Sequence, residues 1–345
     1  MNGGSGRLHL DFGVCSPQPC VLSLSKGSVR MVLLAAAAAW CVTARAQTYP
    51  ERTVRLIVPL APGGGNDAAA RVIAGELGKR LGQQVVVDNR PGGGSVIASQ
   101  LVVNAPADGH TLYLVSTAFS LAQILQAKLP FDSFRDFAPL SRVGISPGGL
   151  IVHPSLPVYK VKDLVAMAKA RPGEITFSSS GLGGGSHLGG ELFNLMANVK
   201  LTHVPYKGSA MATTSVLSGE TQVAFNNPTS SLPHIKAGRL RLVAVTTAKR
   251  WPLLRETPTI AESGVSGYEH VIWNGLSVRA GTPQPILDRL HKELIDVLKT
   301  PLASELLARD GALPAPETPQ SFARFLADEH RKWVPVVKKA GINAN

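Results

Sequence analysis

Apolar and polar residues follow two alternating patterns along most of the chain. Short runs that are mostly apolar and rich in β-branched residues predict β-strands. These runs are residues 53–58, 84–88, 111–115, 149–153, 175–178, 200–204, 223–225 and 240–245. The segments between them carry apolar residues at helical spacing, which predicts helices at residues 68–81, 95–104, 161–170, 186–198 and 210–218. Strands without a polar face are typical of sheets that helices cover on both sides.

The repeated strand–helix order predicts an α/β protein of two lobes, each with a mostly parallel sheet flanked by helices. The apolar residues 271–278 are expected to carry the chain back to the first sheet, so two crossover segments lie near residues 145–150 and 268–275. The expected bounds are 47–147 with 271–345 for lobe 1, and 148–270 for lobe 2. Ligands of such sheets bind beyond the carboxyl ends of the strands, which here means between the lobes.

The first 46 residues have the organisation of an export signal. Lys26 and Arg30 precede an apolar run over residues 31–42, and a small-x-small site ends at Ala46. We expect cleavage after Ala46 and a periplasmic location. An N-terminal membrane anchor is the alternative, but the run is short for a span and its flanks are wrong. The mature chain would have no cysteine, since all three precede the cleavage point: Cys15, Cys20 and Cys41.

The charge balance excludes one class of partner. The whole chain carries a formal net charge of +12, and removal of the signal, which carries +3, leaves about +9. The Lys and Arg residues are scattered, and the densest group is the short segment 236–241. Nucleic-acid binding usually needs a basic stripe or interleaved aromatic residues. We therefore predict no nucleic-acid partner.

Two glycine-rich loops, residues 62–67 and 178–187, each follow a predicted strand and open a helix. Glycine lets the backbone approach a ligand closely, and a helix N-terminus offers N–H groups to an anion. Either loop alone fits a tight turn equally well, but one loop in each lobe would clasp an anion from two sides. Polar residues that follow other strands could complete such a pocket: Thr117, Tyr206, Lys207 and Asn226.

The first loop also fits a dinucleotide-binding fingerprint. The spacing Gly63-x-Gly65-x-x-Ala68 is followed by Asp88 at the end of the next strand, where a ribose-binding acid belongs. An NAD-dependent oxidoreductase is therefore the alternative function. An export signal, prolines beside the turn and a second glycine-rich loop all count against it. The chain has neither a G-x-S-x-G nucleophile elbow nor a paired-histidine metal motif, so we expect no enzyme activity, catalytic residue, metal or cofactor.

Many short motifs of the chain occur in the order found in one family. They are Tyr49-Pro50, Pro62-Gly63 with Asp67, Asn89-Arg90-Pro91-Gly92, Ala107-Asp108-Gly109-His110-Thr111, Ala170-Arg171-Pro172-Gly173, Ser180-Gly181 with Gly183 and His187, His203-Val204-Pro205-Tyr206-Lys207-Gly208, Ile235-Lys236-Ala237-Gly238, Thr257-Pro258-Thr259 and Gly281-Thr282-Pro283. Over roughly residues 48–342 the chain resembles the substrate-binding receptors of tripartite tricarboxylate transporters, the Bordetella uptake gene family.

The resemblance implies a type II periplasmic-binding fold that closes around a small carboxylate and delivers it, as a monomer, to a membrane permease. It implies recognition by backbone amides, bridging water and hydroxyls. The implied ligand contacts are Ala61, Pro62, Gly63, Gly64, Asp67, Thr117, Ala118, Ser179, Ser180, Gly181, Gly183, Gly184, His187, Tyr206, Lys207 and Asn226. Gly184 stands where the family usually has Ser, and Asn226 where Asp is common. The second departure favours a plain mono- or dicarboxylate over an amino acid.

Overall fold

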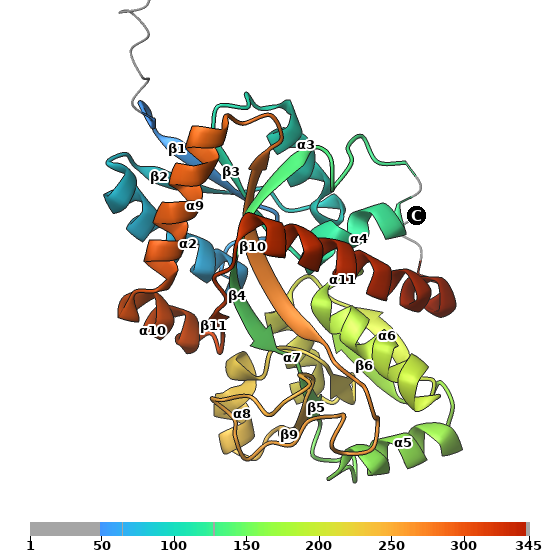
Figure 1. Ribbon diagram of the computed structural model, residues 1–345. Helices are drawn as coiled ribbons and strands as arrows, with labels where there is room; N and C mark the ends of the chain where they lie inside the picture. The colour runs from blue at the N-terminus through green and yellow to red at the C-terminus, as the bar shows by residue number, and fades with distance from the viewer. Residues whose placement is uncertain (1–48, 64, 127, 343–345) are drawn as a thin grey trace, which may run out of the picture. The chain divides into compact units, whose positions relative to one another are not determined.

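The computed structural model describes residues 49–342 except 64 and 127 (Figure 1). The predicted export signal, its cleavage point and the three cysteines lie outside this part of the chain. None of the helices within it is both long enough and apolar enough to cross a bilayer.

The first sheet has the strand order β11-β4-β10-β3-β1-β2. Its strands are β1 (Val54–Val58), β2 (Val85–Asn89), β3 (Thr111–Ser116), β4 (Phe137–Pro147), β10 (Val271–Arg279) and β11 (Leu313–Pro314). β1 pairs in parallel with β2 and β3, whereas β10 pairs antiparallel with β3 and β4. The returning strand β10 and the short β11 run opposite to the other strands, so the sheet is mixed, with most of its strands parallel as predicted.

The second sheet has the order β7-β6-β8-β5-β9. Its strands are β5 (Gly149–Val152), β6 (Thr176–Ser179), β7 (Thr202–Pro205), β8 (Val223–Ala224) and β9 (Arg241–Val245). β6 pairs in parallel with β7 and β8, and β5 pairs antiparallel with β8 and β9. The predicted α/β class with two sheets is confirmed. This sheet too is mixed, because β5, which follows directly after β4, runs antiparallel to β8 and β9.

Helices flank both sheets (Figure 1). Those whose sequence lies next to the first sheet's strands are α2 (Gly65–Leu81), α3 (Val96–Asn104), α4 (Thr117–Leu125), α9 (Gln284–Leu298), α10 (Pro301–Arg309) and α11 (Pro319–Ala340). Those between the strands of the second sheet are α5 (Val161–Ala170), α6 (Gly185–Ala197), α7 (Ser209–Leu217) and α8 (Leu232–Lys236), and two short 3-10 turns are η1 (Gly93–Ser95) and η2 (Pro228–Ser231). Thr300 and Thr318 cap the helices that Pro301 and Pro319 begin, because their hydroxyls accept a backbone N–H of the first turn.

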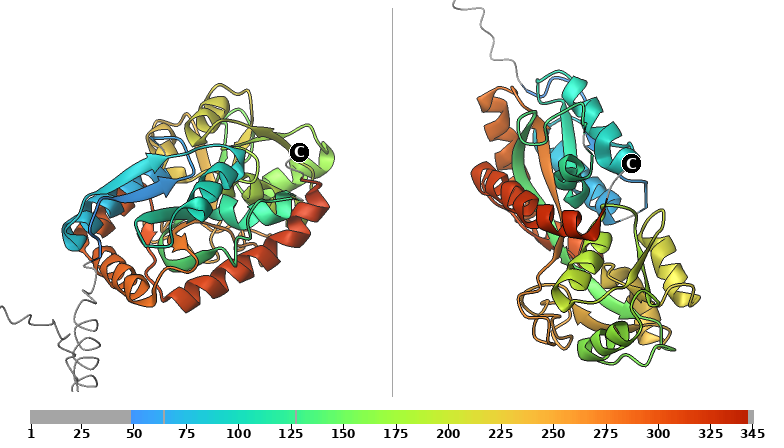
Figure 2. Two further views of the ribbon diagram at one scale, coloured as in Figure 1. Left: turned by 90° about the horizontal axis from the view of Figure 1, so that it is seen from above. Right: turned by 90° about the vertical axis from the view of Figure 1, so that its right-hand side faces the viewer.

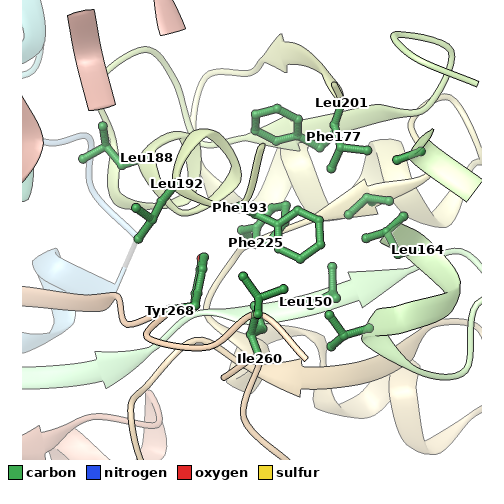
Figure 3. Packing of buried hydrophobic residues seen from close by; sticks show 14 of the residues in the cluster. Leu150, Leu164, Phe177, Leu188, Leu192, Phe193, Leu201, Phe225, Ile260 and Tyr268 are labelled. Atoms are coloured by element: carbon green, nitrogen blue, oxygen red, sulfur yellow. The ribbon is translucent and has the colours of Figure 1, made fainter. Parts of the chain in front are cut away.

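The central strands are buried on both faces, as their continuous apolar character predicts, whereas the edge strands β2 and β7 are partly exposed. Leu56 and Ile57 are adjacent in β1 and both fully buried, yet they belong to different core clusters on opposite sides of the first sheet. In the second sheet, Phe177, Phe193 and Phe225 pack in one core (Figure 3). Each sheet is therefore the middle layer between helices.

The last long helix, α11, takes part in the cores of both sheets. Its residue Phe322 packs with Trp273 of β10, while Trp333 and Val336 belong to the core cluster of the second sheet. α11 runs along β4, α4 and α6, as Figures 1 and 2 show. The predicted division into lobes places all of residues 271–345 in lobe 1 and stays a prediction, but the C-terminal half of α11 packs on the other core.

Besides the short α8 and β11, two elements were not predicted from the sequence pattern, α4 and β4. β4 contains Pro139, Gly144 and Pro147, which depress strand propensity. Its pairing with β10 shifts register twice, so no regular alternation can show in its sequence.

Candidate functional site

The carboxyl ends of strands in both sheets meet the same crossover. Ser116, at the end of β3, pairs with Asn274 of β10, which also pairs with Gly144 of β4. Farther along the same crossover, the Gly149 N–H donates to the Asn226 carbonyl just beyond β8, at 2.7 Å. The chain from Gly144 to Gly149 spans about 17 Å at roughly 3.4 Å per residue. The predicted residues that follow β3 and β8 therefore lie at two ends of one short segment.

The first loop connects β1 to α2, and Asp67 fastens it. Ala61, Pro62 and Gly63 are exposed, whereas Asp67 is buried; Gly64 lies outside the described residues. Asp67 Oδ2 accepts the Gly63 N–H at 3.0 Å and Arg71 Nε at 2.9 Å, and its Oδ1 accepts Asn89 Nδ2 at 3.0 Å. Burial raises the pKa of Asp67, but these hydrogen bonds outweigh burial and hold it below its usual range. Asp67 shapes the loop with both of its oxygens already engaged.

Thr117 and Ala118 begin α4 directly after β3. Thr117 is buried, and its Oγ1 makes no hydrogen bond within the described residues. Ala118 is partly exposed. A buried hydroxyl usually has a partner, so the Thr117 hydroxyl is a candidate to bond a ligand.

The second loop, between β6 and α6, is fastened by its own hydroxyl and imidazole groups. The Ser180 N–H donates to Ser186 Oγ at 2.9 Å, and the Gly181 N–H donates to Ser179 Oγ at 3.1 Å. The Gly183 N–H donates to Nδ1 of His187 at 3.1 Å. The amide of Gly184 donates to the Gly181 carbonyl at 3.3 Å. These four amides are already used, so the donors left for an anion at this loop are those of the first turn of α6.

His187 lies beneath the second loop and is only 2% exposed. Its ring stacks on that of His203, with centroids 3.8 Å apart and planes 16° from parallel. Burial, and then the neighbouring His203, lower the pKa of His187 to about 3, and burial lowers the pKa of His203 to about 4. Both imidazoles are therefore neutral at neutral pH.

The remaining predicted residues have different surroundings. Tyr206 is joined to the second loop through its backbone, because its N–H donates to the Ser179 carbonyl at 3.0 Å. The Tyr206 side chain instead lines a surface cavity of ≈ 280 Å³ together with Met211 and Glu220, and Lys207 is exposed. Asn226 is 1% exposed, and within the described residues neither side-chain atom, Oδ1 or Nδ2, has a hydrogen-bond partner. Leaving a whole amide unpaired in a core is costly, which makes Asn226 a strong candidate for a ligand contact.

The two halves of the predicted site approach one another through α4. A Cβ built on Gly183 would lie 2.6 Å from Cδ1 of Leu125, at the end of the helix that Thr117 begins. No hydrogen bond between the first and the second loop occurs in the described part of the chain. The second loop thus touches the same helix that carries the Thr117 hydroxyl.

One buried residue near the second loop escaped the sequence analysis. His270 precedes β10, is 1% exposed, and lies below the start of α6, where a Cβ on Gly185 would be 3.4 Å from His270 Nε2. A lone histidine before an apolar run carries no motif, so the sequence offers no signal for it. Among the residues the structure describes, no three side chains of His, Cys, Asp or Glu gather in a way that could hold a metal ion.

The comparisons with known proteins agree on one family. Residues 69–342 match the family described as "Tripartite tricarboxylate transporter family receptor". Protein BugT of Bordetella pertussis is 37% identical over 298 residues, which are 86% of this chain and 91% of that protein. The structure titled "R. palustris Rpa4515 with adipate" is 38% identical with a TM-score of 0.79, covering 86% of this chain and 99% of the other. MatC from Rhodopseudomonas palustris with bound malate is 28% identical with a TM-score of 0.76, covering 84% and 100%.

Proposed function

Because the chain belongs to the tripartite tricarboxylate transporter receptor family, we propose that it is a periplasmic receptor that captures a small carboxylate for a membrane permease. Relatives with solved structures hold adipate and malate, both of which are dicarboxylates. The family is one of solute-binding receptors, and no relative supports the alternative of an NAD-dependent oxidoreductase. The permease partner, the monomeric state and cleavage after Ala46 belong to the same proposal.

The observation that carries the proposal is the unpaired amide of Asn226 on the far side of the crossover from the unpaired hydroxyl of Thr117. A carboxylate accepts hydrogen bonds from an amide N–H and from a hydroxyl, and in the described part of the chain both groups are buried without a hydrogen-bond partner. The first turns of α2 and α6 add backbone N–H groups and the positive end of a helix dipole. One carboxylate would lie on the α2 side and the rest of the ligand on the side of α6 and Asn226.

Binding would draw the two sheets' loops together through differential affinity. A ligand that contacts residues after β3 and residues after β8 interacts fully only when both are near it, so it favours the closed arrangement. The closed form would then be the form that the permease recognises.

The proposal is tested by carboxylate binding to the purified protein and to Asn226→Leu. Adipate and malate, with longer, shorter and branched carboxylates beside them, should raise the melting temperature of the wild type by mass action. Asn226→Leu should lose that shift yet be no less stable without ligand, because the buried amide that it removes has no partner. NAD serves as the control for the alternative function. Melting temperatures that no carboxylate raises would refute the receptor.

A further inference from the structure

Three aromatic rings form a cluster under the second loop. Phe177 of β6 and His203 of β7 are cross-strand partners with ring centroids 4.9 Å apart. His203 in turn stacks on His187 of α6 at 3.8 Å, while Phe177 and His187 are 6.5 Å apart. His203 therefore contacts both of the other rings, which are farther from each other. Three elements of the second sheet's layer are joined at this point.

Each imidazole of the cluster makes a polar contact with one end of the loop. Nδ1 of His187 accepts the Gly183 N–H, so in the neutral ring the proton is on Nε2, which faces Glu191 Oε1 at 3.9 Å. Nε2 of His203 lies 2.6 Å from Ser179 Oγ, and the same oxygen accepts the Gly181 N–H. The two rings thus set the positions of two glycine amides in the turn.

Packing alone does not account for two histidines here. A buried imidazole pair costs more than two apolar rings would, because polar nitrogens leave water and two rings that can each protonate lie face to face. What an apolar ring cannot provide is an acceptor for the Gly183 amide and a partner for the Ser179 hydroxyl. The charged or titratable groups near the pair are Glu191 on α6 and His270 beneath the start of that helix.

We propose that His187 and His203 are positioning residues, which hold the second loop in its binding conformation by fixing the Gly183 amide and the Ser179 hydroxyl. In this role the His187 ring supports the loop from below, whereas the resemblance implies that it contacts the ligand. Its consequence for affinity rests on the proposed carboxylate-binding function. Its consequence for the loop itself does not, because both contacts are made between the chain's own groups.

The test compares His187→Asn with His187→Leu. Asn places Oδ1 on Cγ where His has Nδ1, so it can still accept the Gly183 N–H, whereas Leu fills similar space without an acceptor. Hydrogen exchange of the ligand-free protein is followed by mass spectrometry over peptides that span residues 179–187. Leu should speed exchange of this segment about tenfold, the factor expected from one lost hydrogen bond, and Asn should restore most of the protection.

Two further measurements make the outcome decisive. His203→Phe keeps the stack and loses the Ser179 contact, so it should also speed exchange around Gly181. Nitrogen NMR of the wild type should find His187 as the tautomer with its proton on Nε2. Equal protection in the Leu variant and the wild type, or a proton on Nδ1, overturns the positioning role.

Affinity separates this inference from the function. If the wild type binds adipate, the Leu variant should bind it about tenfold more weakly and the Asn variant nearly as well as the wild type. If the wild type binds no carboxylate but the exchange pattern is as expected, the proposed function fails and the positioning role stands. If the wild type and both variants bind alike and exchange alike, the function stands and the positioning role fails.

Discussion

The two glycine-rich loops occupy equivalent places in the two sheets but are fastened by opposite kinds of chemistry. The first depends on a carboxylate: Asp67 accepts from Gly63, Arg71 and Asn89. The second depends on neutral groups, since serine hydroxyls and an uncharged imidazole accept its amides. The same glycine pattern therefore predicts where a loop opens a helix, but it does not predict what holds the loop in place.

The difference should be largest in the free energy of unfolding that is lost when one of these hydrogen-bond acceptors is removed. Asp67→Ala should destabilise the protein by roughly 2–3 kcal/mol, because it leaves the Gly63 N–H, Arg71 and Asn89 without their charged acceptor. Ser186→Ala removes the neutral acceptor of the Ser180 N–H and should cost about 1 kcal/mol. Urea unfolding of both variants measures the two values.

Asp67→Asn is the matched control for charge. It keeps one oxygen for the Gly63 N–H but cannot pair with Arg71, so it should lie between the wild type and Asp67→Ala. Arg71 is more than half exposed, so the ion pair itself adds little to the total. Should Ser186→Ala cost as much as Asp67→Ala, the two loops are fastened equally and the contrast is wrong.

The second difference is what surrounds the glycine of each loop. Gly63 and Gly183 both have positive φ, +86° and +71°, which costs a residue with a Cβ about 1–2 kcal/mol. A Cβ at Gly63 meets nothing within 4 Å, whereas one at Gly183 lies 2.6 Å from Leu125 Cδ1. Gly63→Ala should therefore cost about 1 kcal/mol and Gly183→Ala roughly 2, because the Leu125 side chain must also leave its rotamer.

A double-mutant cycle isolates the contact across α4. Leu125→Ala should remove the excess cost of Gly183→Ala and leave the backbone term, so the two changes are not additive. The same partner change should not alter the cost of Gly63→Ala. Additive effects at Gly183 and Leu125 in unfolding experiments would mean that the second loop does not press on α4.

The fold and the position of both loops follow from the sequence because each rests on local rules. Apolar runs predicted the strands of both sheets, except β4 and the short β11, and glycine after a strand predicted both helix openings. The strand order did not follow, since the insertion of β10 between β3 and β4 is a pairing between residues far apart in sequence. The double role of α11 depends on packing for the same reason.

The candidate site was predicted as a set of residues, but not as a set of roles. Asn226 is buried, and its amide has no partner among the described residues, which suits a ligand contact, while His187 and Asp67 each accept an amide N–H of their own loop. A family motif shows only that a residue type recurs at a position. A residue that contacts the ligand and a residue that holds a loop would both recur in this way. Only the direction of each side chain separates them, and no sequence rule supplies that direction.

The third difference between the loops is their response to pH. His187 has a pKa lowered to about 3 by burial and by His203, against about 6.5 in an unfolded chain. The unfolded chain therefore takes up the proton first. The stability that neutral His187 contributes is complete above pH 6.5 and is lost progressively as the pH falls toward 3. The lowered pKa of Asp67 acts in the same direction, but only below about pH 4.

Between pH 4 and 6.5 only the second loop should respond, and His187→Asn isolates its share. Asn does not titrate but keeps the acceptor for Gly183, so the stability gap between wild type and variant should narrow by about 1 kcal/mol from pH 7.5 to 5.5. Asp67→Asn should keep a constant gap over the same range. His203, His270 and Glu191 titrate in both proteins and largely cancel in the comparison. Urea unfolding at the two pH values measures both gaps, and a constant gap for His187→Asn would show that its ring is not held neutral beneath the loop.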